Sequence, residues 1–437
     1  MEKDFFTELL RRELIVAMGC TEPAAAALAG AAAYRAFARE PEEVLIRASR
    51  DIIKNAMNVG LPNTCLRGIG AAVALGIAGG DTEKGLSILS GIDRGWEAKA
   101  KALLDSGRLR LELAERTPPV FIEVRLRAGE QSLSALIRNV HTEVTIRKNG
   151  KASAAEPPAT DPAAKQPGEA GQFTLEDIFA YVDSVPLGDI AFLAEAAKTN
   201  LNLALHSVKT GYGIQVGKTM FGEGREMDYP EQGAALAAAA SDARMAGCSM
   251  PVVINSGSGN QGITISVPLL VLARGIGSSE EELLRALALA NLTALMVTSH
   301  KGRLSALCGA FTAAMGTAAG YVKLLGPRLG KGGYADEYGA VGRSINIMTG
   351  NLMGIVCDGA KGSCALKIYS CVQAAAMSAK LALAGRTVPD HEGLPGSSPE
   401  DTMGVLEEIS HEGMVPLDKS ILKIMLERKN QQARRKH

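Results

Sequence analysis

Three of the seven cysteines lie in surroundings that favour a bound metal over simple packing. Cys308, Cys357 and Cys364 fall within 303–371, next to Gly, Ala, Ser or Asp residues that leave space around each sulfur. Soft thiolate ligands select iron–sulfur clusters, zinc or Cu(I). The pattern therefore predicts a cysteine-held metal centre.

The spacing of these cysteines favours a cluster over a single ion. Zinc sites usually combine two close pairs, such as CxxC with CxxC or Cys with His, and the sequence has no such pairs. Cys357 and Cys364 are separated by DGAKGS, a loop able to wrap around something bulkier than one ion. Three thiolates can hold three irons of a [4Fe–4S] cluster and leave the fourth open as a Lewis acid. A zinc-binding structural protein is the alternative.

Cys20 is a candidate for proton transfer. It precedes Thr21, a good helix N-cap, and Glu22 and Pro23 suit the first helical positions. A thiol at a helix N-terminus has a depressed pKa, because the dipole and the N–H groups stabilise the thiolate. The segment therefore predicts a reactive thiolate, and the alternative is a small buried hydrophobe.

Two loops rich in Gly, Asn and Ser are suited to gripping a small anion or an amino acid. One spans 55–70 and leads into an Ala/Gly helix, and the other spans 255–262 after a short apolar run. Neither has the spacing of a nucleotide-binding motif. Basic residues just upstream of Cys308 add a further anion contact. The predicted substrate-binding residues are Thr21, Glu22, Asn55, Asn63, Thr64, Asn255, Ser256, Ser258, Asn260 and Arg303.

Apolar periodicity places these loops on a mainly helical scaffold. Alternating apolar and polar residues from about 107 to 150 predict a small antiparallel β unit. We expect an α+β, predominantly α-helical fold with this unit inserted in a helical catalytic body. Its divisions are an N-terminal part of that body at 1–100, the β unit at 101–152, a Pro/Ala-rich linker at 153–171, and a helical cluster-binding domain at 172–437.

Charge and composition exclude several classes of partner. The 437 residues carry 47 Lys and Arg against 47 Asp and Glu, so no net field favours nucleic acid or a membrane surface. An odd number of scattered cysteines and a charged, amphipathic N-terminus indicate a cytoplasmic protein with reduced thiols. The uncharged stretch between Arg303 and Lys323 predicts a tightly packed internal helix. Abundant small residues also favour close contacts in a homo-oligomer.

Several long motifs occur together: GCTEP, SDARMAG, NSGSGNQGI, RLSALC, TAAMGTAAG and CDGAKGSCALK. Together they resemble the L-cysteine desulfidases, a group related to the iron–sulfur L-serine dehydratase alpha chain. The resemblance implies a lyase that converts L-cysteine to pyruvate, ammonia and hydrogen sulfide with a [4Fe–4S] cluster and no pyridoxal phosphate. It also implies that Cys308, Cys357 and Cys364 are the cluster ligands and that Cys20 is the proton acceptor.

The chain departs from the serine dehydratases in one respect. Those similar enzymes can place a C-terminal cysteine on the fourth iron, whereas this sequence ends in ARRKH. The fourth iron is then either open or capped by Cys20. We expect Cys65, Cys248 and Cys371 to be packing residues. The alternatives are a serine dehydratase-type deaminase acting on another β-substituted amino acid, or a non-catalytic iron–sulfur protein that binds cysteine.

Overall fold

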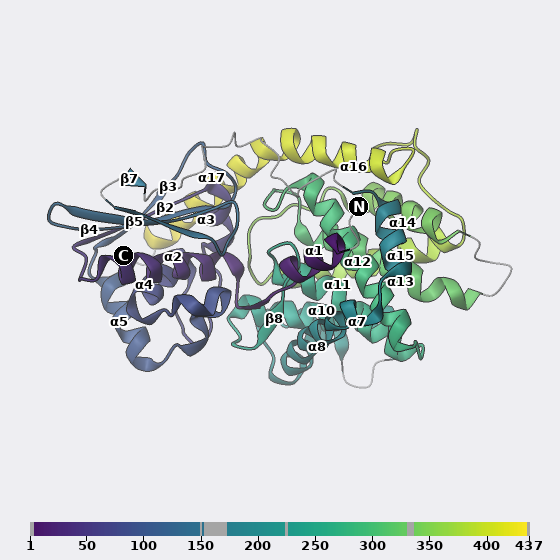
Figure 1. Ribbon diagram of the computed structural model, residues 1–437, viewed down its shortest axis with the longest axis horizontal. Helices are drawn as coiled ribbons and strands as arrows, with labels where there is room; N and C mark the ends of the chain where they lie inside the picture. Colours follow the sequence, from purple (N-terminus) through teal and green to yellow (C-terminus); the bar gives the residue numbers. More distant parts are fainter. Residues whose placement is uncertain (1–3, 149–150, 153–172, 223–225, 330–335, 435–437) are drawn as a thin grey trace.

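The chain forms two lobes, each with its own hydrophobic core (Figure 1). The computed structural model describes residues 4–148, 151–152, 173–222, 226–329 and 336–434. A six-stranded sheet and its covering helices form the smaller lobe, and helices form the larger one. The predicted α+β, predominantly helical fold is therefore confirmed. The predicted linker at 153–171 lies outside the described residues.

The chain enters the sheet lobe after a short strand at 16–18, which pairs with a strand of the helical body. Helices α2 (Thr21–Phe37) and α4 (Gly68–Gly79) pack against one another and α2 lies across the sheet. Gly76 permits this close approach, because a Cβ there would collide with the Ala27 carbonyl oxygen. The lobe also contains α3 (Arg50–Ala56), η1 (Thr82–Gly91), α5 (Arg94–Asp105), β2 (Glu43–Ala48), β3 (Leu109–Leu113), β4 (Phe121–Ala128), β5 (Gln131–Arg138), β6 (Val144–Lys148) and β7 (Lys151–Ala152).

The sheet extends beyond the predicted β unit. Its strand order is β3-β2-β4-β5-β6-β7, with β2 parallel to β3 and every other neighbouring pair antiparallel. Strand β2 alternates buried and half-buried residues, so Val44 and Ile46 face the lobe's core. Strand β2 and helices α2 to α5, which precede or cross the boundary predicted at 101, share one hydrophobic core with β4 and β5.

The helical body surrounds two long apolar helices. Helix α13 (Gly309–Leu325) contains most of the uncharged stretch and is buried, as predicted. In the part of the chain that the structure describes, α12 (Glu280–Lys301) is the one helix long and apolar enough to cross a membrane, but 78% of that window is buried inside the fold. Their surroundings are α1 (Phe5–Glu13), α6 (Leu175–Ser184), α7 (Leu187–Ile190), α8 (Phe192–Thr210), α9 (Val216–Phe221), α10 (Tyr229–Ala246), α11 (Gly259–Gly275), η2 (Gly326–Leu329), α14 (Glu337–Leu352), α15 (Cys364–Leu383), α16 (Pro399–Glu408) and η3 (Ile409–Gly413).

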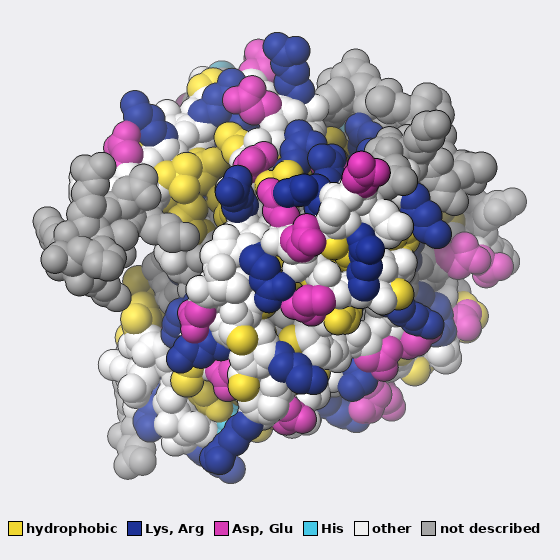
Figure 2. Space-filling model, turned by 90° about the vertical axis from the view of Figure 1, so that its left-hand side faces the viewer, with side chains coloured by type: hydrophobic (Ala, Val, Ile, Leu, Met, Phe, Trp, Pro, Cys, Tyr) yellow, Lys and Arg dark blue, Asp and Glu magenta, His cyan; other side chains and the backbone are white. Residues whose placement is uncertain are grey.

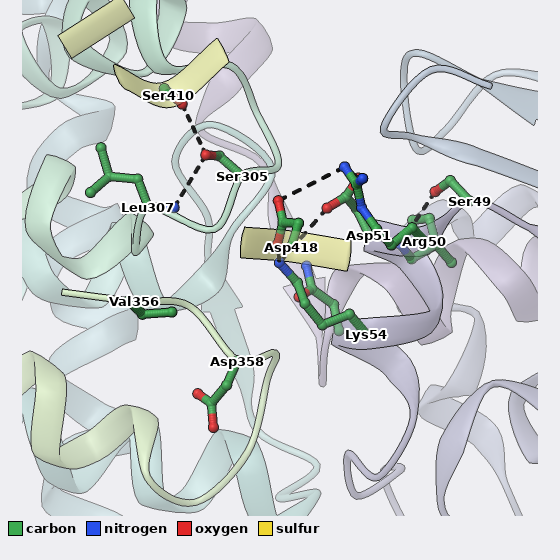
Figure 3. Close-up of polar contacts among 12 residues, drawn as sticks. Ser49, Arg50, Asp51, Lys54, Ser305, Leu307, Val356, Asp358, Ser410 and Asp418 are labelled. Atoms are coloured by element: carbon green, nitrogen blue, oxygen red, sulfur yellow. Dashed lines mark hydrogen bonds and ion pairs between the residues drawn. The ribbon is translucent and has the colours of Figure 1, made fainter. Parts of the chain in front are cut away.

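Two connections fix one lobe against the other. Strand β1 (Val16–Met18) pairs antiparallel with β8 (Pro251–Val253), which anchors the chain just before it enters α2. At the other end of the chain, α17 (Met414–Arg434) returns to the sheet lobe (Figure 1). Its buried Asp418 binds Lys54 and lies 3.9 Å from Arg50 of α3 (Figure 3).

The end of the sheet lobe carries side chains of both charges. Figure 2 shows Lys and Arg interspersed with Asp and Glu on this face, so neither sign dominates it. The pattern agrees with the equal numbers of acidic and basic residues in the chain.

Candidate active site

The three cysteines proposed as metal ligands come from the starts of α13 and α15 and from the loop between α14 and α15. Cys308 is the N-cap of α13, Cys364 is the first residue of α15, and Cys357 lies in the loop before α15. A bridge between Leu307 and Val356 joins the two segments. Within it, the Cys308 N–H donates to the Ile355 carbonyl at 3.0 Å, and the Cys357 N–H donates to the Ala306 carbonyl at 2.6 Å. The fold thus brings Cys308 and Cys357 side by side.

Positive charge surrounds these thiols. A hydrogen bond from Cys308 lowers the pKa of Cys357 to about 6, and Lys54 and Lys367 add to the effect against the opposing influence of burial. The same hydrogen bond, together with burial, raises the pKa of Cys308. Lys301 is also buried within electrostatic reach of both sulfurs, and burial lowers its pKa to about 8. Cys357 therefore has thiolate character, held by neighbouring cations.

The donor set fits an iron–sulfur cluster. Cys364 is electrostatically coupled to both Cys308 and Cys357, so all three sulfurs share one neighbourhood. Within the described residues, no three His, Cys, Asp or Glu side chains are arranged to hold one metal ion. The fit therefore depends on donor chemistry: three soft sulfur ligands from separate segments, with lysines to balance anionic charge.

Buried Lys54 is paired with the C-terminal helix α17. Lys54 is 1% exposed, and Asp418 of α17 is its closest acidic partner, with Asp51 at 3.7 Å. Figure 3 shows Asp418 beside Lys54, and Ser410 bonded to Ser305 of the RLSALC segment at 2.9 Å. Residues 410–418 thereby tie the cysteine-bearing segment to α3.

Cys20 lies at a helix N-terminus, as predicted, but its predicted low pKa is wrong. The N-cap of α2 is Cys20 itself rather than Thr21, and the thiol is 4% exposed. Its Sγ donates to Glu22 Oε2 at 3.3 Å. Burial and then the Glu22 carboxylate raise the pKa of Cys20, and the charge of Arg244 only partly opposes them. Desolvation outweighs the helix dipole here, so the thiol keeps its proton.

Glu22 connects Cys20 to the first binding loop. Its Oε1 accepts a hydrogen bond from Asn55 Nδ2 at 2.8 Å, so one buried carboxylate holds both partners. The Asn55 Oδ1 and Thr21 Oγ1 atoms are buried and have no hydrogen-bond partner among the described residues. Cys364 packs against the small cluster that contains Cys20. The predicted residues Cys20, Thr21, Glu22 and Asn55 thus meet beside one of the proposed metal ligands.

The structure does not bring Asn63 and Thr64 to this place. Asn63 is exposed and donates to the Ser90 carbonyl at 3.2 Å, and the Thr64 hydroxyl donates to Glu97 of α5. Both side chains bind η1 or α5 of the sheet lobe, so these bonds give neither residue a place beside Cys20. Cys65 is exposed rather than packed, whereas Cys248 and Cys371 are buried.

In the second binding loop, some side chains hold the loop together and others have polar atoms without a hydrogen-bond partner in the described residues. Asn255 is fully buried, donates to Asn291 Oδ1 at 2.9 Å and accepts from Ser256 Oγ at 2.7 Å, so its side chain holds the loop together. Ser258 is the N-cap of α11 and makes no side-chain cap bond. Asn260 Oδ1 is buried and has no partner in the described part of the chain. Ser258 and Asn260 therefore remain available to a ligand.

Arg303 is already paired with an acidic residue of the helical body. It forms a two-pronged ion pair with Glu13 of α1, at 3.1 and 2.7 Å, so it already has an anionic partner. With Ser256 it lines a small cavity of about 50 Å³. The predicted role of Arg303 as a substrate anchor is therefore weakened by Glu13, which already neutralises its charge.

His141 is a buried group that the sequence did not single out. It follows β5 in the sheet lobe, and a Cβ on Gly257 of the helical body would lie 3.5 Å from its ring. Its Nε2 has no hydrogen-bond partner within the described ranges. Burial lowers its pKa, against the opposing charge of Glu22, so the imidazole is neutral near pH 7. A single histidine in the NVHTEV strand end carried no spacing signal that would have revealed it.

The chain is similar over nearly its whole length to a group of known sequences. A family model described as the serine dehydratase alpha chain matches residues 83–423. A UPF0597 protein of Oleidesulfovibrio alaskensis is 36% identical over 428 residues, which cover 97% of this chain and 98% of the relative. A UPF0597 protein of Photobacterium profundum is 36% identical over 430 residues, with 96% and 98% covered. One from Clostridium perfringens is 36% identical over 439 residues, with 98% and 99% covered.

Proposed function

Because the chain belongs to the serine dehydratase alpha chain family, we propose that it is an iron–sulfur lyase that eliminates hydrogen sulfide from L-cysteine. One observation carries the proposal. The Cys308, Cys357 and Cys364 thiols share one site with the Cys20–Glu22 pair, which the other lobe contributes. An elimination removes a proton from one atom and a leaving group from the next. A soft metal held by the three thiols would stabilise the leaving group, and the neighbouring pair would move the proton.

Cys308, Cys357 and Cys364 would hold a [4Fe–4S] cluster. When bound, the cluster would supply Lewis-acid chemistry toward the β-substituent of the substrate. Lys54, Lys301 and Lys367 favour the deprotonated thiols that metal binding needs. Asp418 in turn keeps the Lys54 ammonium in place.

The Cys20–Glu22 pair would move the proton. The buried thiol keeps its proton at rest and shares it with Glu22 Oε2 at 3.3 Å. Proton removal from the substrate Cα by Sγ is then coupled to passage of the thiol's own proton to Glu22. The pair ends with a neutral thiol and a neutral carboxyl group, and Asn55 holds Glu22 in position throughout.

The electron pair freed at Cα forms the Cα–Cβ double bond as the Cβ–S bond breaks and its electrons leave with sulfur. Glu22 then transfers the proton it received from Cys20 to the departing hydrosulfide, which gives hydrogen sulfide and restores the carboxylate. The aminoacrylate tautomerises to an imine, and water hydrolyses the imine to pyruvate and ammonia. Burial of Cys20 and Glu22 protects the proton-transfer step from bulk water.

L-serine is the second candidate substrate, because the matching family model is described as serine dehydratase. The same proton transfer would then release water instead of hydrogen sulfide. A thiol is the softer leaving group and is favoured by a thiolate-held iron, whereas a hydroxyl fits the same space. Only a direct comparison of the two amino acids separates these candidates.

The test is purification under anaerobic conditions, followed by measurement of iron and acid-labile sulfide per chain. L-cysteine and L-serine are then supplied in parallel, and pyruvate and hydrogen sulfide are measured. We expect bound iron and sulfide, and release of pyruvate and hydrogen sulfide in equal amounts from L-cysteine. Pyruvate from L-serine alone would identify a dehydratase, and iron-loaded protein that turns over neither amino acid would refute the proposal.

A further inference from the structure

Arg244 is a buried cation near the proposed active site without an anionic partner in the described part of the chain. It lies in the last turn of α10 and is 3% exposed. Its Nε donates to the Gly19 carbonyl at 2.9 Å, directly before Cys20. Its two terminal nitrogens have no acceptor among the residues that the structure describes. Because a buried charge without a counterion is costly, this position favours an anionic ligand.

The start of α11 adds a second source of positive potential beside Arg244. Gly259 is the first residue of this 17-residue helix, and a Cβ there would collide with Arg244 Nε and lie 3.0 Å from Cζ. The first N–H groups of a helix have no partner within the helix, and they carry partial positive charge. Ser258 leaves them without a side-chain cap. A guanidinium and a helix N-terminus therefore lie in direct contact.

Unsatisfied acceptors lie at the same junction. The Asn260 Oδ1 atom, one residue into α11, and the Asn55 Oδ1 atom, beside Glu22, are both buried without a partner in the described ranges. An amide oxygen is a natural acceptor for an ammonium group. Arg244 is also within electrostatic reach of the Cys20 thiol. The junction thus combines N–H donors that can bind an anion, amide oxygens that can bind an ammonium group, and Cys20, the proposed proton acceptor.

We propose that Arg244 and the first turn of α11 bind the α-carboxylate of an amino-acid substrate beside Cys20. The substrate class rests on the proposed function, whereas the carboxylate site follows from Arg244 itself. A guanidinium presents parallel N–H donors that match the two oxygens of a carboxylate. The oxygens of Asn55 and Asn260 accept hydrogen bonds from the α-ammonium group. This assigns to Arg244 the role that the sequence had assigned to Arg303.

The structure offers a conservative variant for the test. In Arg244→Gln the amide nitrogen occupies the position of Nε and keeps the bond to the Gly19 carbonyl, whereas the two terminal nitrogens are lost. Arg274→Gln is the matched control, because Arg274 is exposed at the far end of α11, in the last turn of the helix whose first turn lies against Arg244. Binding is measured by titration calorimetry on anaerobically purified, cluster-loaded protein. The ligands are L-alanine, which has no leaving group, L-alaninamide, which lacks the carboxylate, and inorganic phosphate.

We expect wild-type protein and Arg274→Gln to bind L-alanine more tightly than L-alaninamide or phosphate. Arg244→Gln should weaken L-alanine binding about 10- to 100-fold, the effect of losing a charge-assisted pair, and leave L-alaninamide unchanged. Equal affinity of folded Arg244→Gln and wild type for L-alanine would overturn the proposal. If Arg244→Gln does not fold, the wild type decides, because equal binding of L-alanine and L-alaninamide, or tighter binding of phosphate, also overturns it.

The two proposals fail separately. Loss of L-alanine binding in Arg244→Gln supports the carboxylate site even if L-cysteine releases no hydrogen sulfide, in which case only the proposed reaction is wrong. Turnover of L-cysteine with L-alanine binding that is independent of Arg244 overturns the carboxylate site and leaves the reaction intact.

Discussion

If Cys20 and Glu22 transfer the proton as one unit, replacing either residue should lower kcat as much as replacing both. Glu22→Gln replaces the acceptor 3.3 Å from Cys20 Sγ with an amide that can still accept from Asn55. Cys20→Ala removes the thiol and leaves Glu22 without access to the substrate proton. Each change breaks the same relay at a different atom.

The expected magnitude follows from general acid–base catalysis. A positioned acid or base contributes about 10²- to 10⁴-fold to the rate, or about 3–5 kcal/mol of activation free energy. Each single variant should therefore lower kcat by that factor. The double variant should lower it no further, because residues that act as a unit are strongly non-additive.

The assay is hydrogen sulfide release from L-cysteine at saturation by anaerobic protein, with kcat expressed per iron-loaded chain. Glu97→Gln is the control, since it makes the same change at a carboxylate of α5 that binds Thr64 and the Cys65 N–H rather than Cys20, and it should keep the wild-type kcat. Losses that multiply in the double variant would refute the shared relay. Full activity of Cys20→Ala with an intact cluster would refute the role of Cys20 altogether.

Three further predictions concern the metal, the lobe junction and pH. Cys308→Ser should lower the iron bound per chain after anaerobic reconstitution, whereas Cys65→Ser, at an exposed thiol, should not; equal iron contents would contradict the ligand assignment. Asp418→Ala strips the buried Lys54 ammonium of its closest carboxylate, so urea denaturation should report a loss of about 3–5 kcal/mol in the free energy of unfolding, and a loss below about 1 kcal/mol would argue against a stabilising pair. Burial lowers the pKa of His141, so below the ordinary imidazole pKa of about 6.5 the unfolded chain takes up a proton that the folded protein refuses. Stability should therefore fall as the pH drops below that value, and His141→Gln should lessen the fall in Tm; identical profiles would contradict it.

The sequence by itself determined the features that depend on neighbours along the chain. The small residues beside Cys308, Cys357 and Cys364 marked these thiols, and the structure places two of them at helix starts. The GCTEP segment predicted a helix beginning next to Cys20, and α2 begins there. The uncharged stretch before Lys323 predicted the buried helix α13. Capping and periodicity are local properties, so they can be read before the chain is folded.

The tertiary structure decided which of these groups meet and in what ionisation state. The sequence predicted a low pKa for Cys20 from the helix dipole, but packing of the two lobes buries the thiol next to Glu22 and raises the pKa instead. Arg303 pairs with Glu13 of α1, whereas Arg244 lies against the start of α11 without an anionic partner in the described residues. Desolvation and charge pairing depend on contacts between segments far apart in sequence, and only the packed fold specifies those contacts.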